Sequence, residues 1–250
     1  MFPVFLYSDN PSKSLVMSDV TDFLSQFGLC VEFRGDFLRY LSLESEEMTE
    51  FDSLFRKARI FEIEKPVDFS ENPRPADVFE KDIYDGFWVQ RIFSRFFLRK
   101  HPGELAKNSF HAVITGRLLG TYGSRRYHAR VIISGFPSLV STSGVVEGPA
   151  RPREYYFLKA EFIRSGKDPS ELDEMFRGKF VDYEDPRITK IAGAYVLQPL
   201  LHHFSGKEFC ENGRCALFNS HWQKDVIDIQ YSGHVCAECE SEIRKIAKRR

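Results

Sequence analysis

The hydrophobic positions at the start of the chain change from one periodicity to another. The apolar and aromatic run from Phe2 to Tyr7 predicts a strand. Apolar residues then recur at helical spacing over residues 16–27, Gly28 ends that pattern, and a second strand is expected from Cys30 to Phe33. A strand, a helix and a strand in this order indicate an α/β layer. We expect Cys30 to be a small buried hydrophobic residue.

Two β-rich runs in the middle of the chain predict a hairpin. They extend from His111 to Tyr122 and from Tyr127 to Phe136, and the turn-forming sequence Gly-Ser-Arg-Arg separates them. In such a hairpin His111 and His128 would lie on the two strands and could face each other. Helices are expected over residues 48–58, 78–99 and 170–176, whereas residues 153–165 fit either a helix or a strand.

The longest predicted helix lies in the last third of the chain. Asp185-Pro186 is a favourable start, with Asp as N-cap and Pro at the first helical position, and Gly206 is a favourable end. The residues that would share one face are Ile188, Ile191, Ala192, Tyr195, Val196, Leu200 and His203. Because Pro199 lacks an N–H group and clashes with the carbonyl four residues earlier, we expect the helix to kink or to end its first segment near Gln198.

Composition narrows the class of protein. The 250 residues include 35 Lys+Arg and 36 Asp+Glu, and the net charge of −1 speaks against a dedicated nucleic-acid scaffold. With 42% hydrophobic and 28% charged residues, the chain is typical of a globular protein, and its 24 Phe predict an aromatic core.

The expected compartment decides how the cysteines are interpreted. No apolar stretch approaches the roughly 20 residues that a membrane span needs, and the N-terminus lacks the basic region of a secretory signal. We therefore expect a cytoplasmic protein whose five cysteines stay reduced. In that setting, paired cysteine spacing indicates a metal site before it indicates a disulfide.

Four of the five cysteines form one motif near the C-terminus. Cys210 and Cys215 have the spacing C-x4-C, and Cys236 and Cys239 follow after 20 residues with the spacing C-x2-C. Two such pairs are typical of a structural zinc site, because four thiolates complete the tetrahedral coordination of Zn²⁺ and leave no position for water. We expect one structural zinc per chain.

The residues before this motif carry a resemblance. The stretch from Pro199 to Cys210, PLLHHFSGKEFC, can be aligned without a gap to H-E-x-x-H-x-x-G-x-x-H followed by Cys, the motif of archaemetzincins, whose C-x4-C and C-x2-C pairs match in order and spacing. Over about residues 185–239 the chain resembles an archaeal family of metallopeptidases related to archaemetzincins. The resemblance implies an α/β (α+β) fold with a metzincin-like zincin core, a mixed sheet and a long helix. It also implies one domain over residues 1–250 with a zinc-binding subdomain at 207–250.

The chain departs from the family motif at the positions that matter for catalysis. Pro199 stands at the first ligand position, Leu200 at the general-base position and Phe209 at the third ligand position, while His203 remains at the second. Leu217 replaces the Met that follows the second Cys. Catalytic zinc needs three protein ligands, a water molecule and a base. The sequence therefore predicts a zinc-containing, archaemetzincin-like protein without peptidase activity, with a peptide or protein partner.

Two alternatives stay open. An active metallohydrolase could use relocated ligands, drawn from His128, His202 or His203 together with Glu147 or Glu154. The sequence also permits a nucleic-acid-associated zinc protein, because residues 244–250 are strongly basic, although the near-neutral net charge speaks against it.

Overall fold

A five-stranded mixed sheet forms the centre of the computed structural model, which describes residues 2–70, 82–104, 109–168 and 170–249. The strands lie side by side in the order β2 (Cys30–Asp36), β1 (Pro3–Asp9), β4 (Phe110–Thr115), β8 (Ser138–Ser141) and β7 (Ile132–Ile133). The first four are parallel, and β7 pairs with β8 antiparallel at the edge. Central parallel strands are buried on both faces, and every residue of β4 is buried.

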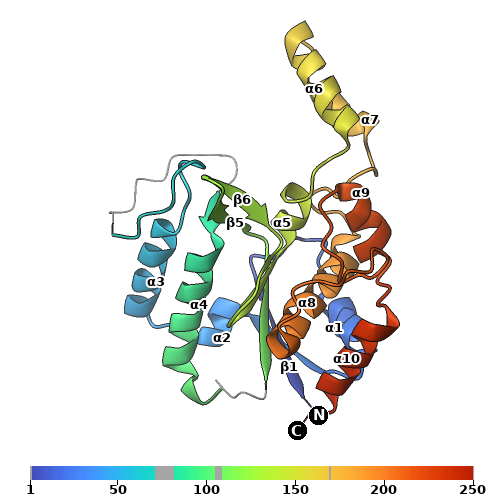
Figure 1. Ribbon diagram of the computed structural model, residues 1–250. Helices are drawn as coiled ribbons and strands as arrows, with labels where there is room; N and C mark the ends of the chain where they lie inside the picture. Colours follow the sequence, from blue (N-terminus) through green and yellow to red (C-terminus); the bar gives the residue numbers. More distant parts are fainter. Residues whose placement is uncertain (1, 71–81, 105–108, 169, 250) are drawn as a thin grey trace.

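Helices cover both faces of this sheet (Figure 1). One layer contains α2 (Phe37–Leu41), α3 (Ser45–Lys57) and α4 (Gly86–Lys100), and the other contains α1 (Met17–Ser25), α8 (Ile188–Ser205) and α10 (Ala237–Ala247). Successive residues of a strand point to opposite faces, so Leu6 joins the core around α8 while Tyr7 joins the aromatic core around α4. The expected α/β class, with a mixed sheet and a long helix, is confirmed.

The expected hairpin is partly wrong. Its first strand is split at Gly116 into β4 and β5 (Leu118–Gly123), and only β5 pairs with β6 (Arg126–Arg130), in a second sheet that also contains β3 (Ile83–Asp85). At Gly116 the backbone passes so close to Asn10 that an added Cβ would lie 2.0 Å from its carbonyl oxygen. The chain leaves the first sheet at this crossing. His111 and His128 therefore lie in different sheets.

The long helix is confirmed as α8, and Gly206 ends it with a left-handed φ of 70°. The expected start is wrong, because the helix begins at Ile188 with Arg187 as N-cap, just after a turn in which the Asp185 carboxylate accepts a hydrogen bond from the Arg187 N–H. Of the two alternatives expected near Gln198, a kink or an end, the end is wrong, because α8 continues through Pro199.

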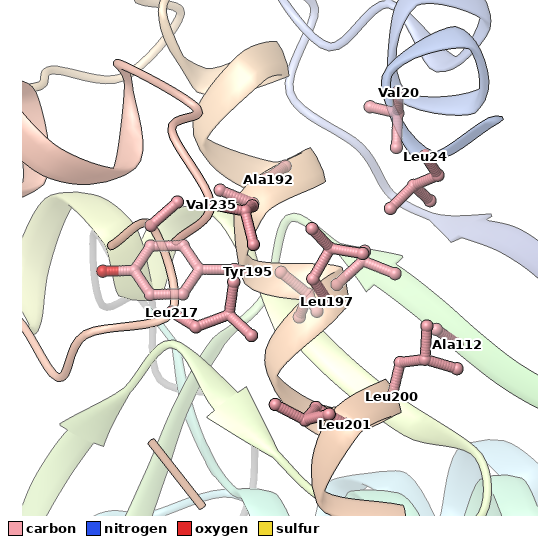
Figure 2. Close-up of a cluster of buried hydrophobic side chains, with 14 of the residues drawn as sticks. Val20, Leu24, Ala112, Ala192, Tyr195, Leu197, Leu200, Leu201, Leu217 and Val235 are labelled. Atoms are coloured by element: carbon pink, nitrogen blue, oxygen red, sulfur yellow. The ribbon is translucent and has the colours of Figure 1, made fainter. Parts of the chain in front are cut away.

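The packing of α8 explains why it tolerates proline. A proline in a helix interior costs roughly 3 kcal/mol. In α8, however, every residue from Ile191 to Leu201 is buried, and contacts with neighbouring elements offset that cost. Figure 2 shows Val20 and Leu24 of α1 on one side of α8, and Leu217 and Val235 on another.

The structure also decides the expectations for Cys30 and for the helices predicted over residues 78–99 and 153–165. Cys30 is exposed, contrary to the expectation, because β2 is an edge strand. The helix expected over 78–99 begins only at Gly86, after β3, and residues 78–81 lie outside the described residues.

Residues 153–165 form a helix, α6 (Arg153–Ser165), followed by α7 (Ser170–Met175). The short elements are η1 (Pro102–Glu104), α5 (Thr142–Glu147), α9 (Gln223–Asp225) and η2 (Val226–Gln230). Among the described residues, every helix is too short or too polar to cross a bilayer.

Candidate metal centre and adjoining cleft

Four cysteine side chains converge where the segment after α8 meets the N-terminus of α10. Cys236 is the N-cap of α10, and Cys239 lies in its first turn. Backbone hydrogen bonds shape the other half of the site: the Cys210 N–H donates to the Leu217 carbonyl and the Cys215 N–H donates to the Asn212 carbonyl, both at 2.9 Å. A turn and a helix start thus present two thiols each.

The geometry of the four thiols fits a zinc ion. Their sulfur atoms all lie within 4.8 Å of one another, and the Sγ atoms of Cys210 and Cys236 are 3.7 Å apart. Tetrahedral coordination with Zn–S bonds of about 2.3 Å separates the sulfurs by roughly 3.8 Å. Cys210, Cys215 and Cys239 are buried and Cys236 is half-buried, so the site is closed to solvent on most sides. A zinc ion bound here would be held by Cys210, Cys215, Cys236 and Cys239.

The thiols differ in how readily they lose a proton before a metal binds. Burial raises the pKa of the Cys215 thiol to about 11, and burial also raises the pKa of Cys239. Burial acts in the same sense on Cys236, but hydrogen bonds from the Cys239 N–H and from neighbouring thiols outweigh it and lower the pKa of Cys236. Because zinc binds thiolates, metal binding at this site is coupled to proton release.

Two buried glutamines connect the metal centre to α8 and to η2. The Gln198 amide nitrogen lies 3.4 and 3.3 Å from the carbonyl oxygens of Ala216 and Phe218, and the Gln230 amide nitrogen lies 3.3 and 2.8 Å from the same two oxygens. The segment after Cys215 is therefore held from both sides. The Oε1 atoms of both glutamines are buried and have no hydrogen-bond partner among the described residues.

Next to this segment lies a cleft, which consists of two adjoining cavities of about 110 and 310 Å³. Both are lined by Arg130, Ile132, Gln198 and Phe209, so the edge strand β7 runs along one wall and α8 forms the other. The smaller cavity also contains Ser220, whose buried hydroxyl has no partner among the described residues.

The surface of α8 that faces the cleft differs from the one that the motif alignment indicates. Tyr195, Gln198 and His202, spaced at three and four residues, line the cleft. His203, the aligned ligand position, lies on another side of the helix, where its ring is 6.1 Å from that of Phe110 and 4.7 Å from that of Phe204. His202, rather than His203, is thus the histidine of this helix that reaches the cleft.

The other candidate ligands lie apart. His128 is in β6, where its Nε2 atom is 3.1 Å from the Gly123 carbonyl oxygen. Glu147, at the end of α5, accepts a hydrogen bond of 2.8 Å from the Tyr183 hydroxyl, and Glu154 is exposed on α6. Among the described residues, the four cysteines alone form a group of three or more His, Cys, Asp or Glu side chains whose ligand atoms are placed to hold one metal ion.

Three polar residues of the cleft were not expected from the sequence. Arg130 lies at the end of β6 and donates a hydrogen bond of 2.7 Å to the Thr121 hydroxyl. Glu208 lines the larger cavity and Ser220 the smaller one. Arg130 and Ser220 lie outside the motif and Glu208 occupies one of its variable positions, and their approach depends on the pairing of β5 with β6 and on the path of the chain after α8. In the sequence, only the four-residue spacing of Gln198 and His202 indicates that two of the cleft residues share one side of a helix.

Comparisons with known proteins complete the description of the site. A family model described as "Probable metallopeptidase family (DUF6775)" matches residues 2–246. No curated protein matches the chain. Among solved structures, the chain is similar to the crystal structure of archaemetzincin from Methanopyrus kandleri, with 13% sequence identity and a TM-score of 0.46, over 99% of this chain and 96% of that chain.

Proposed function

From the premise that this chain belongs to the "Probable metallopeptidase family (DUF6775)", we propose that it is a zinc-stabilised binding protein without peptidase activity. The family membership confirms the resemblance that the motif residues indicated. The loss of activity and the structural role of one zinc ion are our proposals.

The observation that supports an inactive protein is the set of side chains at the motif positions. Pro199 and Leu200 offer neither a metal ligand nor a general base, and His203 packs beside Phe110 on a side of α8 away from the cleft lining. A catalytic zinc ion needs three protein ligands, an open position for water and a group that takes its proton. The motif positions of this chain supply one of the three ligands, His203, and no general base.

The four cysteines support a structural role for zinc. Their four thiolates would complete the coordination of the ion, which would crosslink the turn at Cys210 and Cys215 to the first turn of α10. Ile243 and Ile246, four and seven residues after Cys239 on the same side of α10, lie in the same core as α8. We therefore propose that residues 207–250 form a zinc-binding subdomain within one domain.

The cleft supports binding of a peptide. Its lining combines apolar side chains, such as Phe87 and Phe209, with a few polar groups that include Arg130 and Glu208. Such a mixture is typical of ligand sites. Because β7 is an edge strand, its position along the cleft would also let an extended peptide lie beside it.

An activity and binding assay tests this proposal. The zinc-loaded protein is incubated with a quenched-fluorescent combinatorial peptide library, and the same library without a quencher is used to measure binding by fluorescence anisotropy. We expect no chelator-sensitive cleavage, and binding that Arg130→Ala or Phe209→Ala weakens. Lys179→Ala, at an exposed position outside the cleft lining, is the control. Chelator-sensitive cleavage would refute the proposal, as would binding indifferent to both cleft substitutions.

One observation favours a second candidate, a metallohydrolase with relocated ligands. Gln198, His202 and Glu208 line the same cavity and offer an amide oxygen, an imidazole and a carboxylate, and the Gln198 Oε1 atom has no partner among the described residues. This candidate requires a second metal equivalent per chain that His202→Ala removes. Retention of only one equivalent, unaffected by His202→Ala, would refute it.

A further inference from the structure

The helix α6 stands away from the rest of the molecule, together with α7 (Figure 1). Tyr155 on α6 packs against Leu172 and Phe176 of the α7 region and against Phe180, and these residues form a small hydrophobic cluster separate from the two main cores. The arm, which we define as residues 153–180, is thus held by its own contacts. One face of α6 is enough to form them.

A second face of α6 is apolar and largely exposed. Tyr156, Phe157 and Ile163 are 50%, 77% and 61% exposed, although large aromatic and aliphatic side chains are normally buried. At 3.6 residues per turn, Ala160 lies between them on the same face. This face, Tyr156–Phe157–Ala160–Ile163, is a contiguous apolar stripe on an exposed helix, the pattern of a helix that packs on another helix.

The stripe is complementary to itself when a second copy lies antiparallel, with the two Ala160 residues at the crossing point. In this arrangement Tyr156, four residues before Ala160, comes within about 1.5 Å along the helix axis of Ile163 of the second copy, three residues after Ala160, on one flank. The small Ala160 side chain lets the two helices approach closely. The contact between Tyr156 and Ile163 occurs twice in the symmetric pair.

The charges on the other flank of the stripe are also complementary. Glu154 and Arg164 lie on the same flank as Phe157, and both side chains are exposed. In the antiparallel pair, Glu154 lies within about 3 Å along the helix axis of the height of Arg164 of the second copy. The guanidinium of that Arg164 can also stack on Phe157 of the first copy, a contact that Arg favours. A parallel pair would bring Glu154 level with Glu154 and lose this match.

We propose that the arm is a homodimerisation element in which two α6 helices pack antiparallel through Tyr156, Phe157, Ala160 and Ile163. A helix of 13 residues is about 20 Å long, so the contact is smaller than the roughly 1,200–2,000 Å² of stable complexes. The dimer therefore dissociates at micromolar concentrations. When the dimer forms, the clefts of both copies can bind the same partner molecule.

Sedimentation equilibrium of the full, zinc-loaded chain between about 1 and 300 µM tests this proposal. We expect a monomer–dimer equilibrium that Phe157→Glu shifts to monomer, with an unchanged circular dichroism spectrum because this side chain is exposed. Glu154→Arg and Arg164→Glu should each weaken the dimer at least tenfold, and the double variant should restore it. Within one helix the two residues are about 15 Å apart, so restoration can come only from pairing between copies.

The matched control is Asp52→Arg, the same kind of charge reversal at an exposed position of α3, which should leave the equilibrium unchanged. A wild-type chain that stays monomeric at 300 µM would overturn the proposal, and so would a double variant as weak as the single ones. A monomer that co-sediments with vesicles of phosphatidylserine and phosphatidylcholine in a Phe157-dependent way would assign the stripe to a membrane surface and overturn it equally.

Discussion

The histidine of the central strand β4 should make the stability of this protein depend on pH. His111 is 2% exposed and lies between Tyr7 and Ser109, whose hydroxyl oxygens are each 3.1 Å from one of its ring nitrogens. Nearby, the Arg34 guanidinium donates hydrogen bonds to the hydroxyl groups of Tyr7 and Tyr40 and to the Glu104 carboxylate. Burial disfavours the charged ring, with a smaller opposing effect of the Glu104 charge, and lowers the pKa of His111 from 6.5 to about 4.

The sign and size of the effect follow from these values. Between pH 6.5 and pH 4 the unfolded chain binds a proton at this histidine and the folded chain does not, so the free energy of unfolding falls as the pH falls. Below about pH 4 both states are protonated and the loss stops. A pKa difference of one corresponds to about 1.4 kcal/mol, which gives a loss of about 2 kcal/mol by pH 5 and about 3 kcal/mol in full.

Urea unfolding at pH 7.5, 6 and 5 measures this loss. Carboxylates and zinc release also respond to pH, so the informative quantity is the difference between the wild type and His111→Asn, which lacks the titrating ring. We expect the wild type to lose about 2 kcal/mol more than His111→Asn between pH 7.5 and pH 5. Tyr7→Phe should keep the wild-type pH dependence, because the ring stays buried. Equal pH dependence in wild type and His111→Asn would refute the reasoning.

Further outcomes concern the metal centre and the aromatic core. Replacing Cys210 or Cys239 by Ser should lower the melting temperature measured by calorimetry and reduce bound zinc, whereas His203→Ala should do neither, and negligible effects from all three would contradict a structural zinc site. Removal of zinc by a chelator at neutral pH should expose the C-terminal segment first, seen as faster amide hydrogen exchange over residues 207–250 than in β1; uniform protection would contradict the proposed subdomain. Phe93→Ala should cost about 3–5 kcal/mol of stability by urea unfolding, because this ring is fully buried among other aromatic rings, while the half-exposed Phe87 is the control; equal costs would contradict the described core.

Local patterns predicted the elements whose surroundings the sequence itself specifies. The first strand, helix and strand follow from a change of periodicity, and the four-cysteine cluster follows from spacing that leaves the thiols few other arrangements. The end of α8 at Gly206 follows from the left-handed conformation that glycine adopts easily.

Long-range packing decided what the sequence could not predict. The run that contains Gly116 is one β-rich segment by composition, but the close approach of Asn10 divides it between two sheets. Because α8 is buried on every side from Ile191 to Leu201, its central turns have no exposed polar face to indicate its orientation, and this left the choice between His202 and His203 to the motif alignment. Arg130 and Ser220 reach the cleft from segments far apart in the sequence.

Metal content with X-ray absorption on the full chain, purified without added metal, tests the central claim most directly. We predict one zinc ion per chain with four sulfur ligands at about 2.3 Å, lost in Cys210→Ser and retained in His202→Ala. A second equivalent with nitrogen and oxygen ligands, absent from His202→Ala, would contradict the claim and place a catalytic metal in the cleft.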